Sequence, residues 1–178
     1  MKRLCIPSTI IRENDIELDK DEYYLLFNFF ITNSLCKNQS KRKKTLKDYG
    51  YKKINEVKGI KDIFLIDNIN FDISSSDSLL SEELINYNLL DDKIFDITYE
   101  RGLIINYKES NNYYNYFHAI RNSLAHGEYT MKLNEDNEKV LIMQNSEGNS
   151  IKARMIIKVD TLIKIIKIID KNNIIFKN

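Results

Sequence analysis

Three side chains with complementary chemistry lie close together in the second half of this sequence. Arg121 and Asn122 are followed by His126, at the end of an apolar, helix-patterned segment that Gly127 closes. A guanidinium stays charged and offers a planar fork of donors that matches phosphate oxygens. An imidazole takes up and releases protons near neutral pH, and an amide can fix a ring tautomer or bond a phosphate. These groups can hold a phosphodiester and move a proton beside it.

This set is suited to cleaving RNA without a metal ion. The ribose 2′-hydroxyl would be the internal nucleophile, so the protein must take its proton, stabilise charge on phosphorus and protonate the leaving 5′-oxygen. A structural explanation also fits the spacing, because a histidine in the last turn of a helix can simply complement the helix dipole. His118 has no arginine upstream at a matching spacing, and we interpret it as structural.

Helix geometry constrains how these side chains can meet. Asn122 and His126 are four residues apart, so they adjoin on one face. Arg121 and His126 are five apart, which separates them by about 140° of arc on an ideal helix. Either the helix end near Gly127 bends the histidine round, or a two-fold dimer brings Arg121 of one copy to His126 of the other. We favour the composite site.

The elements that must position this motif are mostly helical in pattern. Asp19 or Asp21 can cap a helix that runs to about residue 37, with apolar residues at the spacing of a buried face. Residues 45–58 predict a short helix or two turns, and residues 60–73 fit extended structure. Residues 74–77 can cap a helix through residue 89, a second short helix is expected near residues 93–97, and Gly102 begins a connection.

The motif itself lies on a helix that begins at Ser110 or Asn111 and ends at Gly127 in a left-handed conformation. Its expected packed face comprises Tyr113, Tyr116, Phe117, Ile120, Leu124 and Ala125. The aromatic residues 113, 114, 116 and 117 could furnish a dimer interface or stack an unpaired base. Short β-rich runs at 129–133, 140–144 and 151–159, separated by turn-rich residues, predict an antiparallel meander. Asp160 then caps a helix whose inward residues are Leu162, Ile163, Ile166 and Ile169.

The predicted fold class is therefore mainly α within the α+β class. One domain spans residues 1–178, with a helical core at about 19–127, a small antiparallel β-meander at about 129–159 and a closing helix at about 160–171.

Composition points to a globular protein of the reduced cytoplasm. The chain is 43% hydrophobic and 30% charged, and no apolar run is long enough to cross a bilayer. Pro7 and the acidic residues from Glu13 onward interrupt any signal-peptide layout. Cys5 and Cys36 form no metal-binding spacing, and no disulfide is implied between them.

The net charge of +1 conceals a strong internal division. Residues 37–61 hold ten Lys and Arg against two acidic residues, a local net charge of +8. Residues 62–100 hold ten Asp and Glu against one Lys, a local net charge of −9. One explanation is that the two segments neutralise each other, or that residues 41–44 form a solvated loop. Because a basic run also supplies a local phosphate-binding field, Lys41, Arg42, Lys43 and Lys44 are candidate RNA contacts.

The motif carries a specific resemblance. The string at residues 120–127, Ile-Arg-Asn-x-x-Ala-His-Gly, follows Phe117 and His118 and precedes Tyr129. It resembles the Arg-Asn-x-x-x-His signature of the HEPN superfamily, whose active members are mostly metal-independent RNA endonucleases. The β-rich stretch, with Lys-Ala-Arg-Met at 152–155 leading into Thr161 and Leu162, is similar to small plasmid- and island-borne HEPN proteins. The likeness covers about residues 110–170, and the N-terminal helices in pattern only.

The resemblance implies a HEPN-like helical bundle and a homodimer with a composite active site. It implies a metal-independent endoribonuclease without cofactor, which leaves a 2′,3′-cyclic phosphate and acts in a toxin–antitoxin or antiphage abortive-infection system. RNA would be the substrate, and an antitoxin or regulatory protein a further partner. Arg121 would hold the phosphate, Asn122 would position it, and His126 would act as general acid or base.

Other features leave alternatives open. One HEPN branch is silenced by nucleotidylation of a tyrosine two residues after the histidine, but here Glu128 holds that position and Tyr129 follows it, which puts such regulation in doubt. Tyr129 and Arg154 are candidate RNA contacts, although we interpret Arg154 in the first place as an exposed strand arginine. The chain could instead be a non-catalytic HEPN-fold module that binds RNA or a nucleotide through the basic run and the aromatic helix. It could also be an antitoxin-like protein whose acidic segment docks a basic partner.

Overall fold

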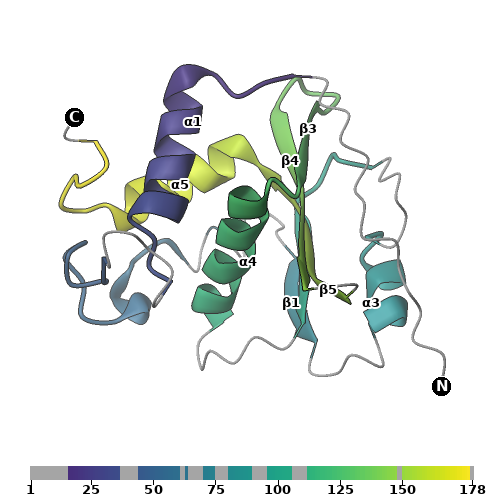
Figure 1. The fold of residues 1–178 in the computed structure, drawn as a ribbon, viewed down its shortest axis with the longest axis horizontal. Helices are drawn as coiled ribbons and strands as arrows, with labels where there is room; N and C mark the ends of the chain where they lie inside the picture. Colours follow the sequence, from purple (N-terminus) through teal and green to yellow (C-terminus); the bar gives the residue numbers. More distant parts are fainter. Residues whose placement is uncertain are drawn as a thin grey trace.

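A mixed β-sheet lies at the centre of the protein, in a computed structural model that describes residues 16–36, 44–60, 63, 70–74, 80–89, 96–105, 112–147 and 150–176. Its five strands follow the order β1-β2-β5-β4-β3 (Figure 1). β1 (Asn70–Ser74) pairs in parallel with β2 (Arg101–Ile105), and every other pairing in this sheet is antiparallel. The described chain therefore belongs to the α+β class.

The meander predicted from residue alternation is confirmed. It consists of β3 (Tyr129–Leu133), β4 (Lys139–Glu147) and β5 (Ser150–Lys158). The turn between β3 and β4 forms because the Asn134 side-chain oxygen accepts hydrogen bonds from the backbone N–H groups of Asp136 (3.1 Å) and Glu138 (2.8 Å).

The sheet is larger than the small appendage that the sequence predicted. Gly102 was expected to begin a connection, but it lies inside β2 and pairs with Met155 of β5. Leu103 and Ile104 beside it are fully buried, so β2 is an interior strand of the sheet. We interpreted Gly102 as the start of a connection, whereas the apolar residues that follow it form a strand.

Described helices cover both faces of the sheet, with more of them on one face than on the other. α1 (Lys20–Phe27), α4 (Asn112–His126) and α5 (Val159–Ile169) lie on one side, and α3 (Leu80–Asn86) lies on the other (Figure 1). β4 is buried on both faces as a result. Its residues Leu141 and Met143 join the large apolar cluster under the three helices. The alternate residue Ile142 joins a smaller cluster that includes Leu84 of α3.

The first helix begins as predicted and ends earlier. Asp19 caps α1 by accepting hydrogen bonds from the backbone N–H groups of Asp21 and Glu22, and the Glu22 carboxylate accepts one from the Asp19 N–H in return. The α-helix continues as a wider π-helical turn (η1, Asn28–Thr32) and stops there, instead of reaching residue 37. Asn33 closes this turn, because its side-chain N–H₂ donates to the backbone and side-chain oxygens of Asn28.

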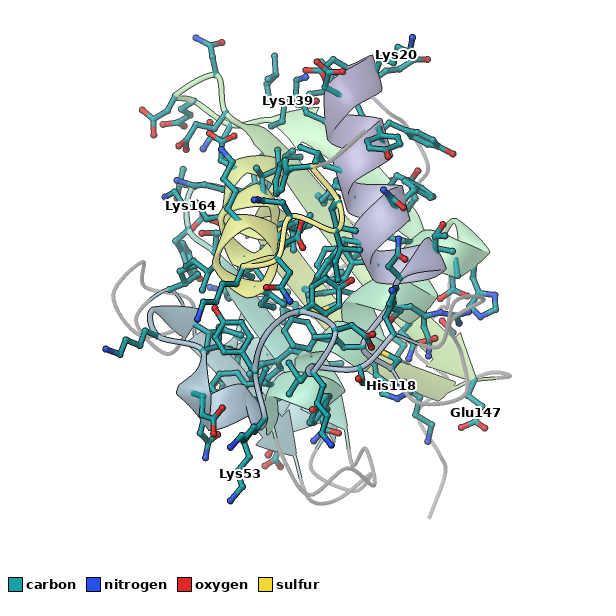
Figure 2. The ribbon with its side chains drawn as sticks, turned by 90° about the vertical axis from the view of Figure 1, so that its left-hand side faces the viewer. Lys20, Lys53, His118, Lys139, Glu147 and Lys164 are labelled. Carbon is teal, nitrogen blue, oxygen red and sulfur yellow. The ribbon has the colours of Figure 1, made fainter. Side chains whose placement is uncertain are left out.

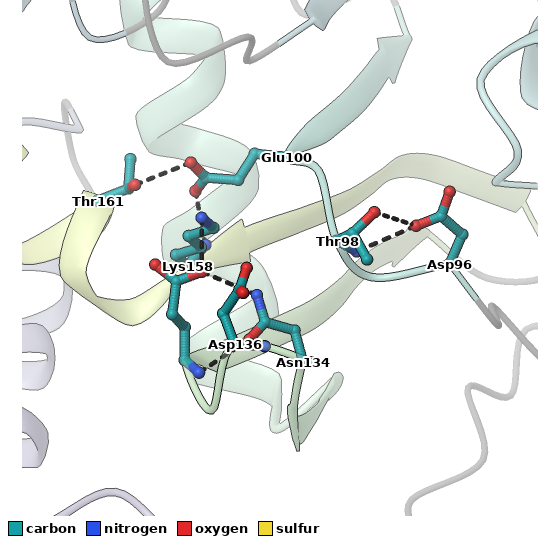
Figure 3. A network of polar contacts seen from close by, with 8 residues as sticks. Asp96, Thr98, Glu100, Asn134, Asp136, Lys158 and Thr161 are labelled. Atoms are coloured by element: carbon teal, nitrogen blue, oxygen red, sulfur yellow. Dashed lines mark hydrogen bonds and ion pairs between the residues drawn. The ribbon is translucent and has the colours of Figure 1, made fainter.

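The last helix is capped from elsewhere in the chain. Asp160 was predicted as its cap, but Lys158 is the N-cap residue and Asp160 lies exposed in the first turn. The buried Glu100 carboxylate takes the capping role, accepting hydrogen bonds from the Lys158 N–H (2.6 Å) and the Thr161 hydroxyl (2.9 Å; Figure 3). Three of the predicted inward residues are buried, namely Leu162, Ile166 and Ile169, and Ile163 is half-buried.

The remaining predicted elements are short or fall partly outside the described residues. The segment 45–58 holds turns and one 3₁₀ turn, η2 (Ile54–Glu56). The expected caps at residues 75–77 and the motif-helix start at Ser110 or Asn111 lie outside the described residues, as does most of the second short helix, whose positions 96 and 97 are not helical. Within the ranges that the structure describes, none of the helices has the length and apolarity to span a membrane.

Candidate functional site

Helix α4 presents one packed face and one polar face. Tyr116, Phe117, Ile120 and Leu124 are buried against η1 and β4, as predicted. The Phe117 ring lies 6.5 Å from the ring of Phe29 and 6.4 Å from that of Phe30, measured between centroids. Ala125 was expected in the packed face but is exposed, and Tyr113 and Tyr114 are half-buried. The other face is less buried and is polar except for one alanine; it comprises His118, Arg121, Asn122, Ala125 and His126.

Arg121 and Asn122 form a hydrogen-bonded pair on this polar face. The Arg121 guanidinium donates from Nη1 to the Asn122 amide oxygen over 2.9 Å. Both side chains are half-buried, so the guanidinium has little freedom to turn away from the helix. Asn122 was predicted to bind or position a phosphate. In the structure its amide oxygen accepts a hydrogen bond from Arg121 and so orients the guanidinium.

His126 is the last residue of the helix and is exposed. Gly127 follows it with a φ of +64°, the left-handed conformation predicted for the residue that ends the helix. Because α4 stays helical through His126, the backbone does not bend this histidine toward Arg121. The arc of about 140° between the two residues is therefore retained within one chain.

The turn after the helix is firmly attached to the sheet. The Glu128 N–H donates to the Ser123 carbonyl oxygen (2.9 Å), and the Glu128 carbonyl oxygen accepts from the Gln144 N–H (2.8 Å). The Glu128 carboxylate accepts from the Ser146 N–H (2.9 Å). These bonds fix the end of α4 against β4, so Glu128, two residues after His126, has a structural role.

Tyr129 begins β3 beside an aromatic pair on α1. Tyr23 is 53% exposed and stacks on Phe27 with ring centroids 4.2 Å apart. Burial raises the pKa of the Tyr129 hydroxyl, and the nearby Tyr23 raises this pKa further. Tyr129 therefore keeps its proton at neutral pH, and it places a phenol three residues from His126.

Among the other predicted RNA contacts that the structure describes, Arg154 is buried and Lys44 lies beside an acidic residue. Arg154 was described as an exposed strand arginine, and that description is wrong, because Arg154 is 1% exposed. Its Nε donates to the Gln144 side-chain oxygen (2.9 Å) and its Nη1 to the Leu89 carbonyl oxygen (2.7 Å). A phosphate at the surface cannot reach this guanidinium in the present conformation. Lys44 lies 3.9 Å from the Asp48 carboxylate, and Lys41, Arg42 and Lys43 lie outside the described residues.

A second buried arginine was missed by sequence reasoning. Arg101 is 1% exposed and donates hydrogen bonds to four backbone carbonyl oxygens, those of Tyr87, Asn88, Asp96 and Tyr99. Its guanidinium also lies 4.2 Å from the centroid of the Tyr99 ring. Arg101 and Arg154 thus hold the segment after α3 against the sheet, and both are structural.

The described surface also has a hollow away from the motif. A shallow groove of about 560 Å³ between α1 and α5 is lined by Asp19, Lys20, Asp21, Glu22, Leu25, Asp160, Ile163 and Lys167. Lys139 lies 2.6 Å from Glu22 and 3.6 Å from Asp19, so acidic charge at this end of α1 is partly neutralised. In the parts of the chain that the structure covers, no three His, Cys, Asp or Glu side chains gather as metal ligands would.

No family model, curated protein or solved structure matches this chain.

Proposed function

We propose that this protein is a metal-independent endoribonuclease of the HEPN type. It would cleave RNA by attack of the 2′-hydroxyl on the adjacent phosphorus, acting in the cytoplasm in a toxin–antitoxin or antiphage system. The assignment of α4 and its neighbouring helices to a HEPN-like bundle is part of this proposal. The observation that carries it is the half-buried, hydrogen-bonded Arg121–Asn122 pair on α4, with an exposed imidazole one turn later.

Each of these side chains has a role in the proposed reaction. Arg121, oriented by Asn122, binds the non-bridging phosphate oxygens and stabilises the charge that develops on them. His126 transfers a proton at the 2′-oxygen or the 5′-oxygen. The O2′–P bond forms as the P–O5′ bond breaks, which leaves a 2′,3′-cyclic phosphate and a free 5′-hydroxyl.

The wide angle between Arg121 and His126 supports a composite site. Since α4 does not bend before His126, one chain does not aim both side chains at a single phosphate. A two-fold homodimer would bring Arg121 of one copy to His126 of the other and would form two equivalent sites.

The test uses the purified full-length protein with structured and single-stranded RNA in EDTA. We expect cleavage by the wild type and loss of cleavage in His126→Ala and Arg121→Ala, with Lys167→Ala on α5 as the surface control. Absence of cleavage by the wild type, or full activity in His126→Ala, would overturn the proposal. Salt-sensitive RNA binding without any cleaved product would instead identify a non-catalytic binding module.

Mixing two inactive variants tests the composite site. In a heterodimer of Arg121→Ala with His126→Ala, one of the two sites has both native side chains. After subunit exchange we expect recovery of about a quarter of the wild-type activity, because about half the dimers are mixed and half their sites are intact. No recovery despite demonstrated exchange would place Arg121 and His126 in the same chain's site.

A further inference from the structure

The proposed cleavage requires two proton transfers, and the motif supplies one imidazole. One group must take the proton of the 2′-hydroxyl while another delivers a proton to the leaving 5′-oxygen. A guanidinium does not carry protons near neutral pH, and an amide neither takes up nor releases one. A second proton carrier near the Arg121–Asn122 pair is therefore needed.

His118 lies next to this pair on the same helix. It precedes Arg121 by three residues and Asn122 by four, the two spacings at which side chains on a helix are neighbours, with Cβ atoms about 5–6 Å apart. The arc between His118 and Arg121 is about 60°, against about 140° between Arg121 and His126. Within one chain, His118 is thus the histidine that shares a face with the guanidinium.

The burial pattern along α4 agrees with this placement. The residues that flank His118 in sequence, Phe117 and Ala119, are fully buried, whereas His118 itself is half-buried like Arg121 and Asn122. Figure 2 shows His118 toward the same end of the molecule as Glu147, the last residue of β4. A core histidine would lie on the opposite face of this helix.

Few charged groups come from the elements packed against α4. The π-helical turn η1 contains no ionisable residue. β4 carries Lys139 at its start and Glu147 at its end, where Glu147 pairs with Lys152 over 3.9 Å. β2 contributes Arg101, whose described hydrogen bonds are to backbone carbonyl oxygens on the α3 side of the sheet.

We propose that His118 is the second proton-transfer residue of the site. This inference rests on the proposed ribonuclease function and replaces the structural role that the sequence suggested for His118. One of the two imidazoles accepts the 2′-hydroxyl proton as O2′ bonds to phosphorus, and the other, as imidazolium, donates its proton to O5′ as the P–O5′ bond breaks. In the composite site, His118 and Arg121 come from one copy and His126 from the other.

The decisive measurement is the pH dependence of cleavage by His118→Gln and His118→Asn, with folding verified by thermal unfolding and Lys167→Gln as control. The wild type should show a bell-shaped dependence of kcat/KM on pH. We expect each His118 variant to lose one limb of the bell and about 10²–10⁴-fold in kcat, with a small change in KM. A rate within about threefold of the wild type, or a reduced rate that keeps both limbs, overturns the assignment.

A substrate with sulfur in place of the 5′-bridging oxygen separates the two histidines, because a thiolate leaves without a proton. One of the variants His118→Gln and His126→Ala should recover its rate on this substrate, and the other should not. Recovery by neither variant would contradict the paired roles. If the wild type does not cut RNA at all, the proposed function fails. If His126→Ala is inactive while His118→Gln behaves as wild type, only the present inference fails.

Mixing experiments give an independent test of which copy supplies His118. After subunit exchange, His118→Gln mixed with His126→Ala should recover about a quarter of the activity, whereas His118→Gln mixed with Arg121→Ala should stay inactive. Recovery in the second mixture would contradict the placement of His118 and Arg121 on one helix face of the same site.

Discussion

Replacing Glu100 tests whether a buried carboxylate holds the final helix on the sheet. Glu100 is 4% exposed and lies 58 residues before Lys158, whose N–H it accepts at the start of α5. Its second oxygen accepts the Thr161 hydroxyl proton at 2.9 Å (Figure 3). The informative variants are Glu100→Ala, which removes both acceptors, and Glu100→Gln, which removes the charge and keeps one acceptor.

The expected losses follow from these contacts. A hydrogen bond to a charged group contributes about 1.5–3 kcal/mol to the free energy of unfolding. Two such bonds are offset by the cost of burying the carboxylate, so we expect Glu100→Ala to lose about 2–4 kcal/mol. In Glu100→Gln the amide oxygen can still accept the Lys158 N–H and the amide N–H₂ can donate to Thr161. The loss should then be about 1 kcal/mol, mainly the interaction of the charge with the helix dipole.

Urea unfolding followed by far-ultraviolet circular dichroism measures these losses, with an unchanged m-value as the condition for comparing them. Asp160→Asn is the matched control, because Asp160 lies in the same helical turn but is exposed, and we expect it to lose about 0.5 kcal/mol or less. Thr161→Val should show a coupling of about 1 kcal/mol with Glu100→Ala. A loss below about 0.5 kcal/mol in Glu100→Ala, or equal losses in both Glu100 variants, would refute the capping role.

Three further changes have defined outcomes. Arg101→Met removes four hydrogen bonds to backbone carbonyl oxygens, and we expect the free energy of unfolding in urea to fall by about 3–4 kcal/mol. A fall of less than about 1 kcal/mol would show that water replaces these bonds. Tyr49→Phe removes a 2.8 Å hydrogen bond to the Asn33 carbonyl oxygen and should cost about 1–2 kcal/mol. Burial, and then the charge of Asp170, raise the pKa of Tyr49, so its contribution is present below about pH 10 and declines at higher pH as the unfolded chain ionises. Tyr49→Phe should flatten this alkaline decline, and an unchanged pH dependence would contradict the assignment. Gly127→Ala, at a φ of +64° with open space around the added Cβ, should cost about 1 kcal/mol with RNA cleavage retained, and a stability equal to wild type would contradict the backbone argument.

Features governed by local sequence were predictable. The Asp19 cap, the helical end at Gly127 and the turn at Asn134 depend on residues within four positions of each other. The strands of the meander follow from alternation between β-branched and polar residues, because each face of a strand has its own environment. The packed face of α4 was correct except at Ala125, which lies near the end of the helix, where fewer partners cover it.

Features that depend on distant partners were not predictable. Arg101 and Glu100 are adjacent charged residues before a glycine, a pattern typical of a surface loop. Both are buried because their partners come from other elements, the carbonyl oxygens around α3 and the start of α5. Arg154 was misplaced for the same reason, since Gln144 and Leu89 supply its acceptors. His118 was interpreted as structural because no arginine precedes it at a matching spacing, and its half-buried environment, like that of Arg121 and Asn122, is seen only in the structure.

The attachment of Glu128 to β4 ties the backbone two residues after His126 to an interior strand of the sheet. Three hydrogen bonds join this one residue to Ser123, Gln144 and Ser146. We therefore expect the end of α4 to loosen on heating only when the sheet itself separates. The proposed RNA cleavage activity and the β-structure should therefore be lost over the same temperature range. In proteins whose reactive groups lie on loops with few contacts, activity is commonly lost at a lower temperature than the fold.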